Sequence, residues 1–295
     1  MNFSENSENP LSLSNAGRTT IKKTASLNGT GLHKGGKSEI TFVPAEEPSG
    51  IRFVKTDVFP RQAIEAGLKN VIDTARGTSL GIGKHAIYTV EHVLSACMGL
   101  GIDDLDVEIR GDEIPAMDGS ALPFSLALLG AGMKFKQNQP KKILNLSGKF
   151  EISIEKAKYK VKPSGSLQFS VTYEHPHKLI KKQTAEICLE KDDYVKEIAP
   201  ARTFGFKSEI EELRKHGLAL GGSLENAVVI DENCFLTSPG GLRFENEFAR
   251  HKLLDLLGDL KLTGLSLRNL SVEASYTSHR TNVNFAKLLL ERTGK

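Results

Sequence analysis

One histidine and two aspartates recur at intervals of four residues within an apolar segment, residues 243–260. They are His251, Asp255 and Asp259. Residues four apart lie on the same face of an α-helix, one above the other. Leucine and phenylalanine occupy many of the other positions, which is typical of a buried helix, and buried carboxylates need a cation, a metal ion or a tight hydrogen-bond network. The alternative is an exposed polar stripe on an amphipathic helix.

These side chains have the chemistry of a zinc site. Zinc in a hydrolase typically takes three protein ligands and a water molecule. His251 and Asp255 would supply two ligands from one helical face, and the Glu91-His92 pair is the best source of a third. Adjacent helical residues diverge by about 100°, so His92 could bind the metal while Glu91 faces the water as a general base. The metal would lower the pKa of that water to about 7.

A further histidine could complete a hydrolytic site. His279 lies at the end of the last predicted strand and could act as a general acid or an electrophilic group. Asp259, one turn beyond Asp255, could hydrogen-bond to His279 and favour the imidazolium. His33, in a Gly-rich turn, is another candidate, although most loop histidines carry no chemistry. The chain has no G-x-x-x-x-G-K-[ST] phosphate loop and no G-x-S-x-G nucleophile elbow, so nucleotide and serine-hydrolase chemistries have less support.

The composition is that of an ordinary globular protein. Of 295 residues, 25% are charged and 39% hydrophobic, and the net charge is +3. This mild positive charge suits an anionic small ligand but lacks the concentrated basic face of a nucleic-acid-binding protein. Three widely separated cysteines and the absence of a long apolar run predict a cytoplasmic protein with no disulfide framework and no transmembrane segment.

Two regions of alternating strand and helix patterns flank a polar linker. We expect a disordered tail over residues 1–17, an N-terminal α+β domain over 18–136, a linker over 137–142 and a C-terminal α+β domain over 143–295. The two halves share a weak internal repeat, in which a His-bearing helix has a glycine seven residues after the histidine and is followed by a strand. This repeat predicts two domains of similar plan.

Local signals set the expected element boundaries near the candidate site. Thr89 is a good N-cap for the helix that carries Glu91 and His92. The Gly-rich stretch 76–84 before it is predicted to be a loop. The final amphipathic helix is predicted over residues 284–290.

Six sequence blocks, in their order along the chain, resemble those of one enzyme family. They are Gly29-Thr-Gly-Leu-His33, Thr89-Val-Glu-His92, Glu113-Ile-Pro-Ala-Met-Asp-Gly-Ser120, Ala201-Arg-Thr-Phe-Gly-Phe206, Gly217-Leu-Ala-Leu-Gly-Gly-Ser223 and Leu242-Arg-Phe-Glu-Asn-Glu-Phe-Ala-Arg-His-Lys-Leu-Leu-Asp-Leu-Leu-Gly-Asp259. The chain resembles UDP-3-O-acyl-N-acetylglucosamine deacetylases, the zinc amidases that commit Gram-negative bacteria to lipid A synthesis. The resemblance runs from about Thr19 to Leu290.

The resemblance implies one zinc ion per chain and a set of catalytic roles. It assigns His92, His251 and Asp255 as zinc ligands, Glu91 as the general base and His279 as the general acid or oxyanion stabiliser.

Further roles follow from the same resemblance. Asp259 would support His279, and Thr203 would help to polarise the acetyl carbonyl as its oxyanion forms. Phe204 would line the site, Lys252 would contact the sugar-phosphate part of the substrate, and Tyr173 would stack on uracil.

An insert at about residues 206–230 matches the family's βαβ insert, an apolar passage for the 3-O-acyl chain. Its candidate lining residues are Ile210, Leu213, Leu218, Ala219 and Val228. The sequence departs from the family in a shortened 76–84 loop and in Ser278, because the family usually has glycine before the late histidine.

The implied fold is α+β, with two similar domains, each a β-sheet packed with a pair of α-helices, and the active site between them. The implied reaction removes acetate from UDP-3-O-acyl-N-acetylglucosamine and gives UDP-3-O-acyl-glucosamine. We expect a monomer with a small-molecule substrate, no nucleic-acid partner and at most peripheral membrane contact through the acyl chain. The alternatives are a zinc amidase acting on another acylated amino sugar and a non-catalytic nucleotide-sugar binding protein.

Overall fold

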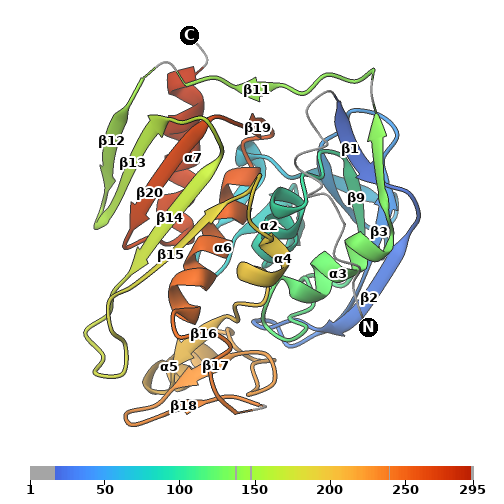
Figure 1. The fold of residues 1–295 in the computed structure, drawn as a ribbon. Helices are drawn as coiled ribbons and strands as arrows, with labels where there is room; N and C mark the ends of the chain where they lie inside the picture. Colours follow the sequence, from blue (N-terminus) through green and yellow to red (C-terminus); the bar gives the residue numbers. More distant parts are fainter. Residues whose placement is uncertain (1–16, 137, 147, 239, 294–295) are drawn as a thin grey trace.

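The computed structural model describes residues 17–136, 138–146, 148–238 and 240–293, and it shows an α+β protein with two five-stranded sheets (Figure 1). The predicted tail, residues 1–17, lies outside the described residues except for Gly17. In spatial order, the first sheet contains β2 (Ala25–Thr30), β3 (Lys37–Pro44), β9 (Leu105–Arg110), β4 (Ile51–Lys55) and β5 (Gln62–Glu65). The second contains β12 (Phe150–Ile154), β13 (Ala157–Pro163), β20 (Leu270–Ser275), β14 (Gln168–Tyr173) and β15 (Gln183–Cys188).

The two sheets have the same topology. In each, the last strand along the chain lies in the middle, parallel to the third strand and antiparallel to the second. In each half one helix precedes this central strand and a second helix follows it. They are α2 (Glu91–Gly99) and α3 (Leu122–Gly130) in the first half, and α6 (Glu247–Lys261) and α7 (His279–Thr293) in the second. The weak sequence repeat therefore reflects a repeated fold, and the predicted α+β class is confirmed.

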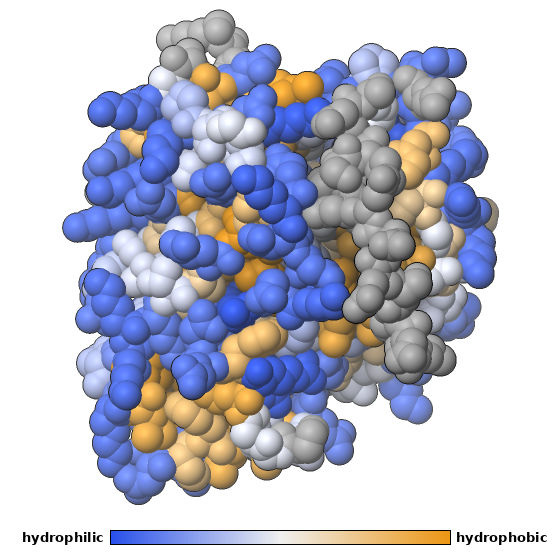
Figure 2. All heavy atoms as spheres, in the orientation of Figure 1, coloured by the Kyte–Doolittle hydropathy of each residue, from blue (hydrophilic) through white to orange (hydrophobic). Residues whose placement is uncertain are grey.

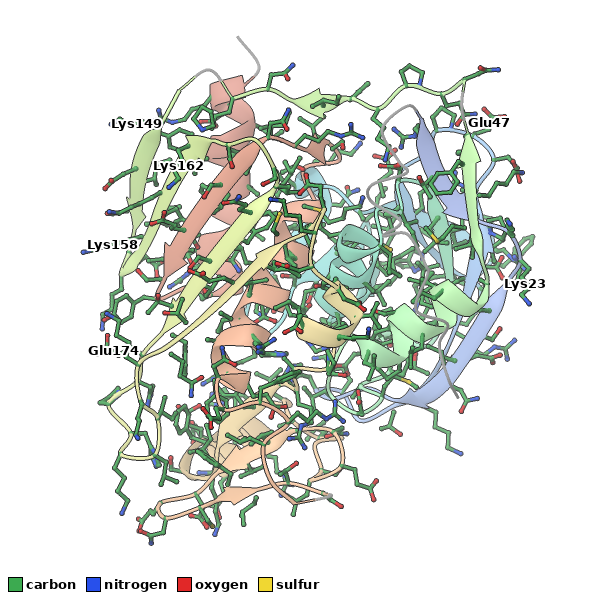
Figure 3. All side chains as sticks on the ribbon, viewed as in Figure 1. Lys23, Glu47, Lys149, Lys158, Lys162 and Glu174 are labelled. Carbon is green, nitrogen blue, oxygen red and sulfur yellow. The ribbon has the colours of Figure 1, made fainter. Side chains whose placement is uncertain are left out.

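Each sheet buries one face, as the alternating patterns require. Along β13, Ala157, Tyr159 and Val161 are buried in the second core, while Lys158 and Lys162 are exposed on the opposite face and point into solvent (Figure 3). The helices cover the buried faces, so each half has its own apolar core.

Helices α2 and α6 pack side by side between the two sheets (Figure 1). Gly258 permits this contact, because a Cβ atom there would lie 2.2 Å from the carbonyl oxygen of Glu91. The close approach of the two backbones brings the polar residues of α2 next to the polar row of α6. Both helices are buried almost throughout, as predicted for α6.

Each half carries an insertion, which comes before α2 in the first half and before α6 in the second. The first is an antiparallel sheet of β6 (Val71–Asp73), β7 (Ser79–Ile82) and β8 (His85–Ile87). The second contains β16 (Phe204–Phe206), α5 (Lys207–Lys215), β17 (Val228–Ile230) and β18 (Phe235–Leu236). Strands β16 and β17 are parallel and are joined through α5, so this is the expected βαβ unit. Apolar side chains gather over this unit at the lower end of Figure 2.

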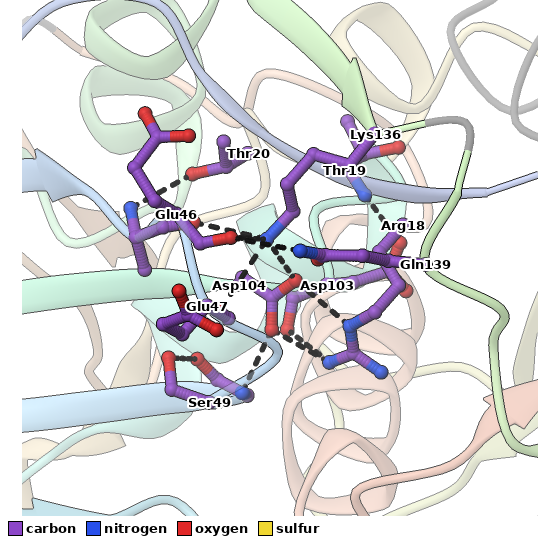
Figure 4. A network of polar contacts seen from close by, with 12 residues as sticks. Arg18, Thr19, Thr20, Glu46, Glu47, Ser49, Asp103, Asp104, Lys136 and Gln139 are labelled. Atoms are coloured by element: carbon purple, nitrogen blue, oxygen red, sulfur yellow. Dashed lines mark hydrogen bonds and ion pairs between the residues drawn. The ribbon is translucent and has the colours of Figure 1, made fainter.

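The remaining elements are short. They are β1 (Arg18–Ile21), β10 (Met133–Lys136), β11 (Ile143–Leu144), β19 (Ser266–Leu267), the 3-10 turn Leu68–Asn70 and α4 (Tyr194–Glu197). Strands β1 and β10 pair with each other and are tied to the first sheet by Asp104, whose buried carboxylate forms ion pairs with Arg18 at 2.6 Å and Lys136 at 2.7 Å (Figure 4). No helix among the described residues is long and apolar enough to cross a membrane.

Three predicted boundaries are wrong. Thr89 is not an N-cap: α2 begins at Glu91, and the Thr89 hydroxyl donates instead to the Glu113 carboxylate at 2.9 Å. Residues 76–84 are not all loop, because Ser79–Ile82 forms β7. His279 does not end a strand but begins α7, whose N-terminus Ser278 caps by accepting the N–H of Thr281 on its hydroxyl at 3.3 Å.

Candidate active site

Helices α2 and α6 bring three potential metal ligands together. His92 comes from α2, and His251 and Asp255 come from successive turns of α6. One ligand atom of each residue lies within 4.8 Å of the others, and all three side chains are buried. Among the residues that the structure describes, this is the one cluster of histidine, cysteine and carboxylate side chains with metal-binding spacing.

The protonation of these residues fits a metal site. Burial, reinforced by the neighbouring His251, lowers the pKa of His92 to about 3, so its imidazole is neutral and can act as a ligand. The Nδ1 atom of His251 lies 3.1 Å from the carbonyl oxygen of Ala201. A carbonyl only accepts, so Nδ1 carries the proton and Nε2 keeps its lone pair, the arrangement usual for a metal-bound histidine.

Asp255 has a carboxylate oxygen without a hydrogen-bond donor in the cluster. Its Oδ1 atom is buried, has no hydrogen-bond partner and lies 3.4 Å from His251 Nε2. Burial opposes ionisation, but the interactions with His251 and Lys252 outweigh it and hold the pKa of Asp255 far below its usual range. A buried, ionised oxygen without a donor is costly unless a cation fills the space. Two imidazole nitrogens and one carboxylate oxygen form a ligand set that zinc commonly takes.

Glu91 lies beside this cluster with a pKa suited to proton transfer at neutral pH. Burial raises the pKa of Glu91 to about 7. Its Oε2 atom accepts the backbone N–H of Thr78 at 2.9 Å, which fixes the carboxylate, while Oε1 lies 3.8 Å from Nε2 of His279. A general base works best when its pKa is near the working pH.

His279 is held next to Glu91 by Asp259. Its Nδ1 atom lies 3.0 Å from Asp259 Oδ2, which also accepts a hydrogen bond from Asn282 at 2.9 Å. The Thr78 hydroxyl donates to the second oxygen of Asp259 at 2.5 Å. Burial disfavours the imidazolium, but the carboxylates of Asp259, Asp255 and Glu91 outweigh it and raise the pKa of His279 to about 10. His279 is therefore a proton donor whose Nε2 faces the site.

An aromatic and basic wall adjoins the metal cluster. The ring centroid of Phe204 lies 5.9 Å from that of His251 and 5.4 Å from that of Tyr173. Lys252 lies over Phe204, with Nζ 5.5 Å from the ring centroid, and also contacts Asp255 Oδ2 at 2.8 Å. These residues, which are far apart in sequence, thus lie together beside the cluster.

The remaining predicted site residues lie on the insert or directly before it. Thr203 is anchored through its backbone N–H, which donates to the carbonyl of Gly119 at 2.7 Å. Ile210 and Leu213 lie on α5, and Leu218 and Ala219 lie in the loop after it; these four side chains are partly exposed. Val228, on β17, is fully buried against Ile180, Ile230 and Phe248.

Two residues of the site were not predicted from the sequence. Thr78 contacts both Glu91 and Asp259, yet it lies in a stretch with no signal beyond its glycines. Asn282 lies on the first turn of α7, three residues after His279. Identifying Ser278 as an N-cap would have predicted that a helix begins at His279. His279 and Asn282, three residues apart, would then lie on the same face of that helix.

Comparison with known proteins identifies one family. The family model for UDP-3-O-acyl N-acetylglycosamine deacetylase (LpxC) matches residues 18–291. A UDP-3-O-acyl-N-acetylglucosamine deacetylase of Sulfurimonas denitrificans is 42% identical over 274 residues, which are 93% of this chain and 90% of that protein. Proteins of the same name from Syntrophus aciditrophicus (41% over 273 residues; 92% and 86% of the two chains) and Myxococcus xanthus (42% over 245 residues; 83% and 77%) are similar.

Proposed function

Because the chain belongs to the UDP-3-O-acyl N-acetylglycosamine deacetylase family, we propose that it hydrolyses the N-acetyl group of UDP-3-O-acyl-N-acetylglucosamine. The products are acetate and UDP-3-O-acyl-glucosamine, and the reaction commits its substrate to lipid A synthesis. The observation that carries the chemistry is the buried cluster of His92, His251 and Asp255, with the unpaired Oδ1 of Asp255, beside the neighbouring pair of Glu91 and His279. The free, widely spaced cysteines are compatible with a reaction in the cytoplasm.

One zinc ion per chain is the proposed cofactor. His92, His251 and Asp255 would hold it, and two neutral imidazoles with one ionised carboxylate match its preferences. When bound, zinc supplies Lewis-acid chemistry, which polarises the amide carbonyl and makes a water molecule available as a nucleophile near neutral pH.

Glu91 and His279 would move the protons. Glu91 takes a proton from the attacking water as the new C–O bond forms, because its raised pKa of about 7 lets it be both ionised and basic at neutral pH. His279 enters the reaction protonated, since its pKa is about 10. It donates from Nε2 to the sugar nitrogen as the C–N bond breaks, or first stabilises the negative charge on the carbonyl oxygen. Asp259 keeps Nδ1 occupied, so that Nε2 remains the donor.

The wall beside the cluster would bind the substrate. Thr203 would stabilise the developing oxyanion, and Lys252 would contact the negatively charged diphosphate side of the substrate. Phe204 would line the site, and the neighbouring Tyr173 would stack on uracil. The partly exposed residues Ile210, Leu213, Leu218 and Ala219 would line the acyl passage, with Val228 supporting it from the buried side.

The test combines metal analysis with product detection. About one zinc per chain and acetate release from UDP-3-O-acyl-N-acetylglucosamine that a chelator abolishes and added zinc restores would support the metal, the reaction and the substrate together. Zinc without acetate release would redirect the proposal to another acylated amino sugar. A protein that binds UDP-sugar but neither zinc nor a hydrolysable amide would overturn the enzyme assignment.

A further inference from the structure

We propose that Glu113 is a positioning residue for this reaction: its buried carboxylate fixes the backbone at Thr89 and so sets where Glu91 and His92 enter the site. The inference rests on the proposed deacetylation. Glu113 touches neither the metal cluster nor the proposed catalytic groups, so it would act through its neighbours.

The backbone directly before the catalytic pair is held in an unusual conformation. Thr89 has a φ angle of +61° although it is β-branched, and such residues are rare in the left-handed region. The next residue, Val90, is the N-cap of α2 and offers no side-chain cap. The start of α2 therefore depends on contacts from elsewhere in the chain to keep this conformation.

Glu113 provides the side-chain contact. Its Oε1 atom accepts the Thr89 hydroxyl at 2.9 Å, and the backbone of residues 112–114 pairs with Tyr88: Tyr88 N–H donates to Asp112 at 2.9 Å, and Ile114 N–H donates to Tyr88 at 3.1 Å. Glu113 as a whole is only 3% exposed. The hydrogen bond to Thr89 and the backbone pairing at Tyr88 together leave the segment that leads into Glu91 little freedom.

The same carboxylate also anchors the turn between β2 and β3. It accepts the backbone N–H groups of His33 at 2.8 Å and Lys34 at 2.7 Å. Gly31 allows the approach, because a Cβ atom there would lie 2.3 Å from Glu113 Oε2. This contact explains why the Gly-Thr-Gly-Leu-His block needs its second glycine.

The anchored turn reaches the active site by a second route. His33 Nε2 lies 3.2 Å from the carbonyl oxygen of Arg76, just before Thr78, whose N–H and hydroxyl hold Glu91 and Asp259. The backbone carbonyl of His33 also accepts the N–H of Leu220 at 3.1 Å, and Leu220 lies in the loop that follows α5. Glu113 thus supports Glu91 through Thr89 on one side and through the turn and Thr78 on the other.

The test is the substitution Glu113→Gln, which keeps the size of the side chain but replaces one acceptor oxygen with a donor that faces other donors. We expect kcat to fall at least tenfold while KM for UDP-3-O-acyl-N-acetylglucosamine changes less than threefold and zinc content stays at one per chain. Glu108→Gln, at a partly exposed carboxylate of β9 paired with Arg61, is the matched control and should leave both constants unchanged. Thr89→Val, which exchanges the hydroxyl for a methyl group, should reproduce the fall in kcat. It serves as the test if the Glu113→Gln variant does not fold.

A second background tests the route. Glycine adopts the left-handed conformation without strain, so a Thr89→Gly protein should depend less on Glu113. The fold-decrease in kcat caused by Glu113→Gln should be at least five times smaller in the Thr89→Gly protein than in the wild type. An equal loss in both backgrounds would overturn the role of Thr89, and an unchanged kcat in both Glu113→Gln and Thr89→Val would overturn the positioning role. A wild-type enzyme that releases no acetate would instead overturn the proposed function and, with it, this inference.

Discussion

Asp259 binds His279 through Nδ1, at 3.0 Å, and thereby leaves Nε2 as the only ring nitrogen that faces Glu91 and Asp255. The two residues are 20 positions apart and come from α6 and α7, so the packing of these helices creates the pair. Asn282 and Thr78 complete the shell around Asp259, and neither of them contacts the metal cluster.

This pair predicts the pH dependence of the reaction. Activity should rise as Glu91 loses its proton near pH 7 and fall as His279 loses its proton near pH 10. Asp259→Asn removes a negative charge that stabilises the imidazolium, so the pKa of His279 should fall and the alkaline limb should move to lower pH. The measurement is kcat/KM between pH 5.5 and 10.5 in both proteins. An alkaline limb at the same pH in both would contradict the assignment of that limb to His279.

Glu91→Gln should separate metal binding from proton transfer. Glutamine keeps an oxygen for the Thr78 N–H but cannot accept a proton, so kcat should fall by about 10²- to 10⁴-fold. Zinc content should remain near one per chain. Glu273→Gln, at an exposed residue of β20, is the control for general effects of losing a carboxylate. Wild-type turnover in Glu91→Gln would exclude Glu91 as the base.

Asp255→Ala should weaken zinc binding, because it removes the anionic ligand and leaves two neutral imidazoles. The loss should exceed the roughly 10- to 100-fold typical of outer-shell changes at metal sites. Competition with a zinc-binding dye gives the affinity. Asp231→Ala, at a partly exposed carboxylate paired with Lys207, should leave zinc affinity as in the wild type. An undiminished affinity in Asp255→Ala would remove this residue from the ligand set.

Asp104 should contribute stability that depends on pH. Burial opposes its ionisation, but hydrogen bonds from Arg18, Lys136 and the backbone of Gly50 prevail and lower its pKa. A carboxylate with a lowered folded-state pKa contributes fully above its unfolded pKa of about 3.9 and loses the contribution as pH falls through the folded value. Asp104→Asn should therefore cost about 3 kcal/mol at pH 7, and this cost should shrink as the pH falls below about 4.

Denaturant unfolding of metal-free protein at pH 7 and pH 3 measures this effect without a contribution from zinc binding. Asp106→Asn is the matched control, because its partner Arg52 is partly exposed and surface pairs contribute at most about 1 kcal/mol. Equal costs of Asp104→Asn at both pH values would show that the ion pairs of Asp104 do not stabilise the fold.

Local periodicity in the sequence was sufficient to predict much of the site. The four-residue spacing of His251, Asp255 and Asp259 predicted one row on a buried helix, which α6 confirms. The contacts of Thr78 could not be predicted in this way, because Asp259 lies 181 residues away and only the tertiary fold brings the two side chains together. Long-range contacts determine which hydrogen bonds a short polar residue makes.

The error at Thr89 has the same origin. The local rule for N-caps treats a threonine before a helix as a cap, but the nearby Glu113 carboxylate offers a stronger, charged acceptor for the hydroxyl. For His279 the local signal is only the residue type of Ser278, because serine is preferred at N-caps but Thr281 is not the glutamate or glutamine of a capping box.

Helices α2 and α6 occupy equivalent places in the two halves, yet their chemistry is unequal. Both carry a histidine seven residues before a glycine, but the positions equivalent to Asp255 and Asp259 on α6 are Ala96, within α2, and Leu100, its C-cap. Such a pattern is what a gene duplication followed by divergence would leave: one copy kept or gained the carboxylates, and the other became the donor of a single ligand and the base. Neither copy could then evolve as an independent enzyme, so selection on the reaction would also preserve the joining of the two halves in one chain.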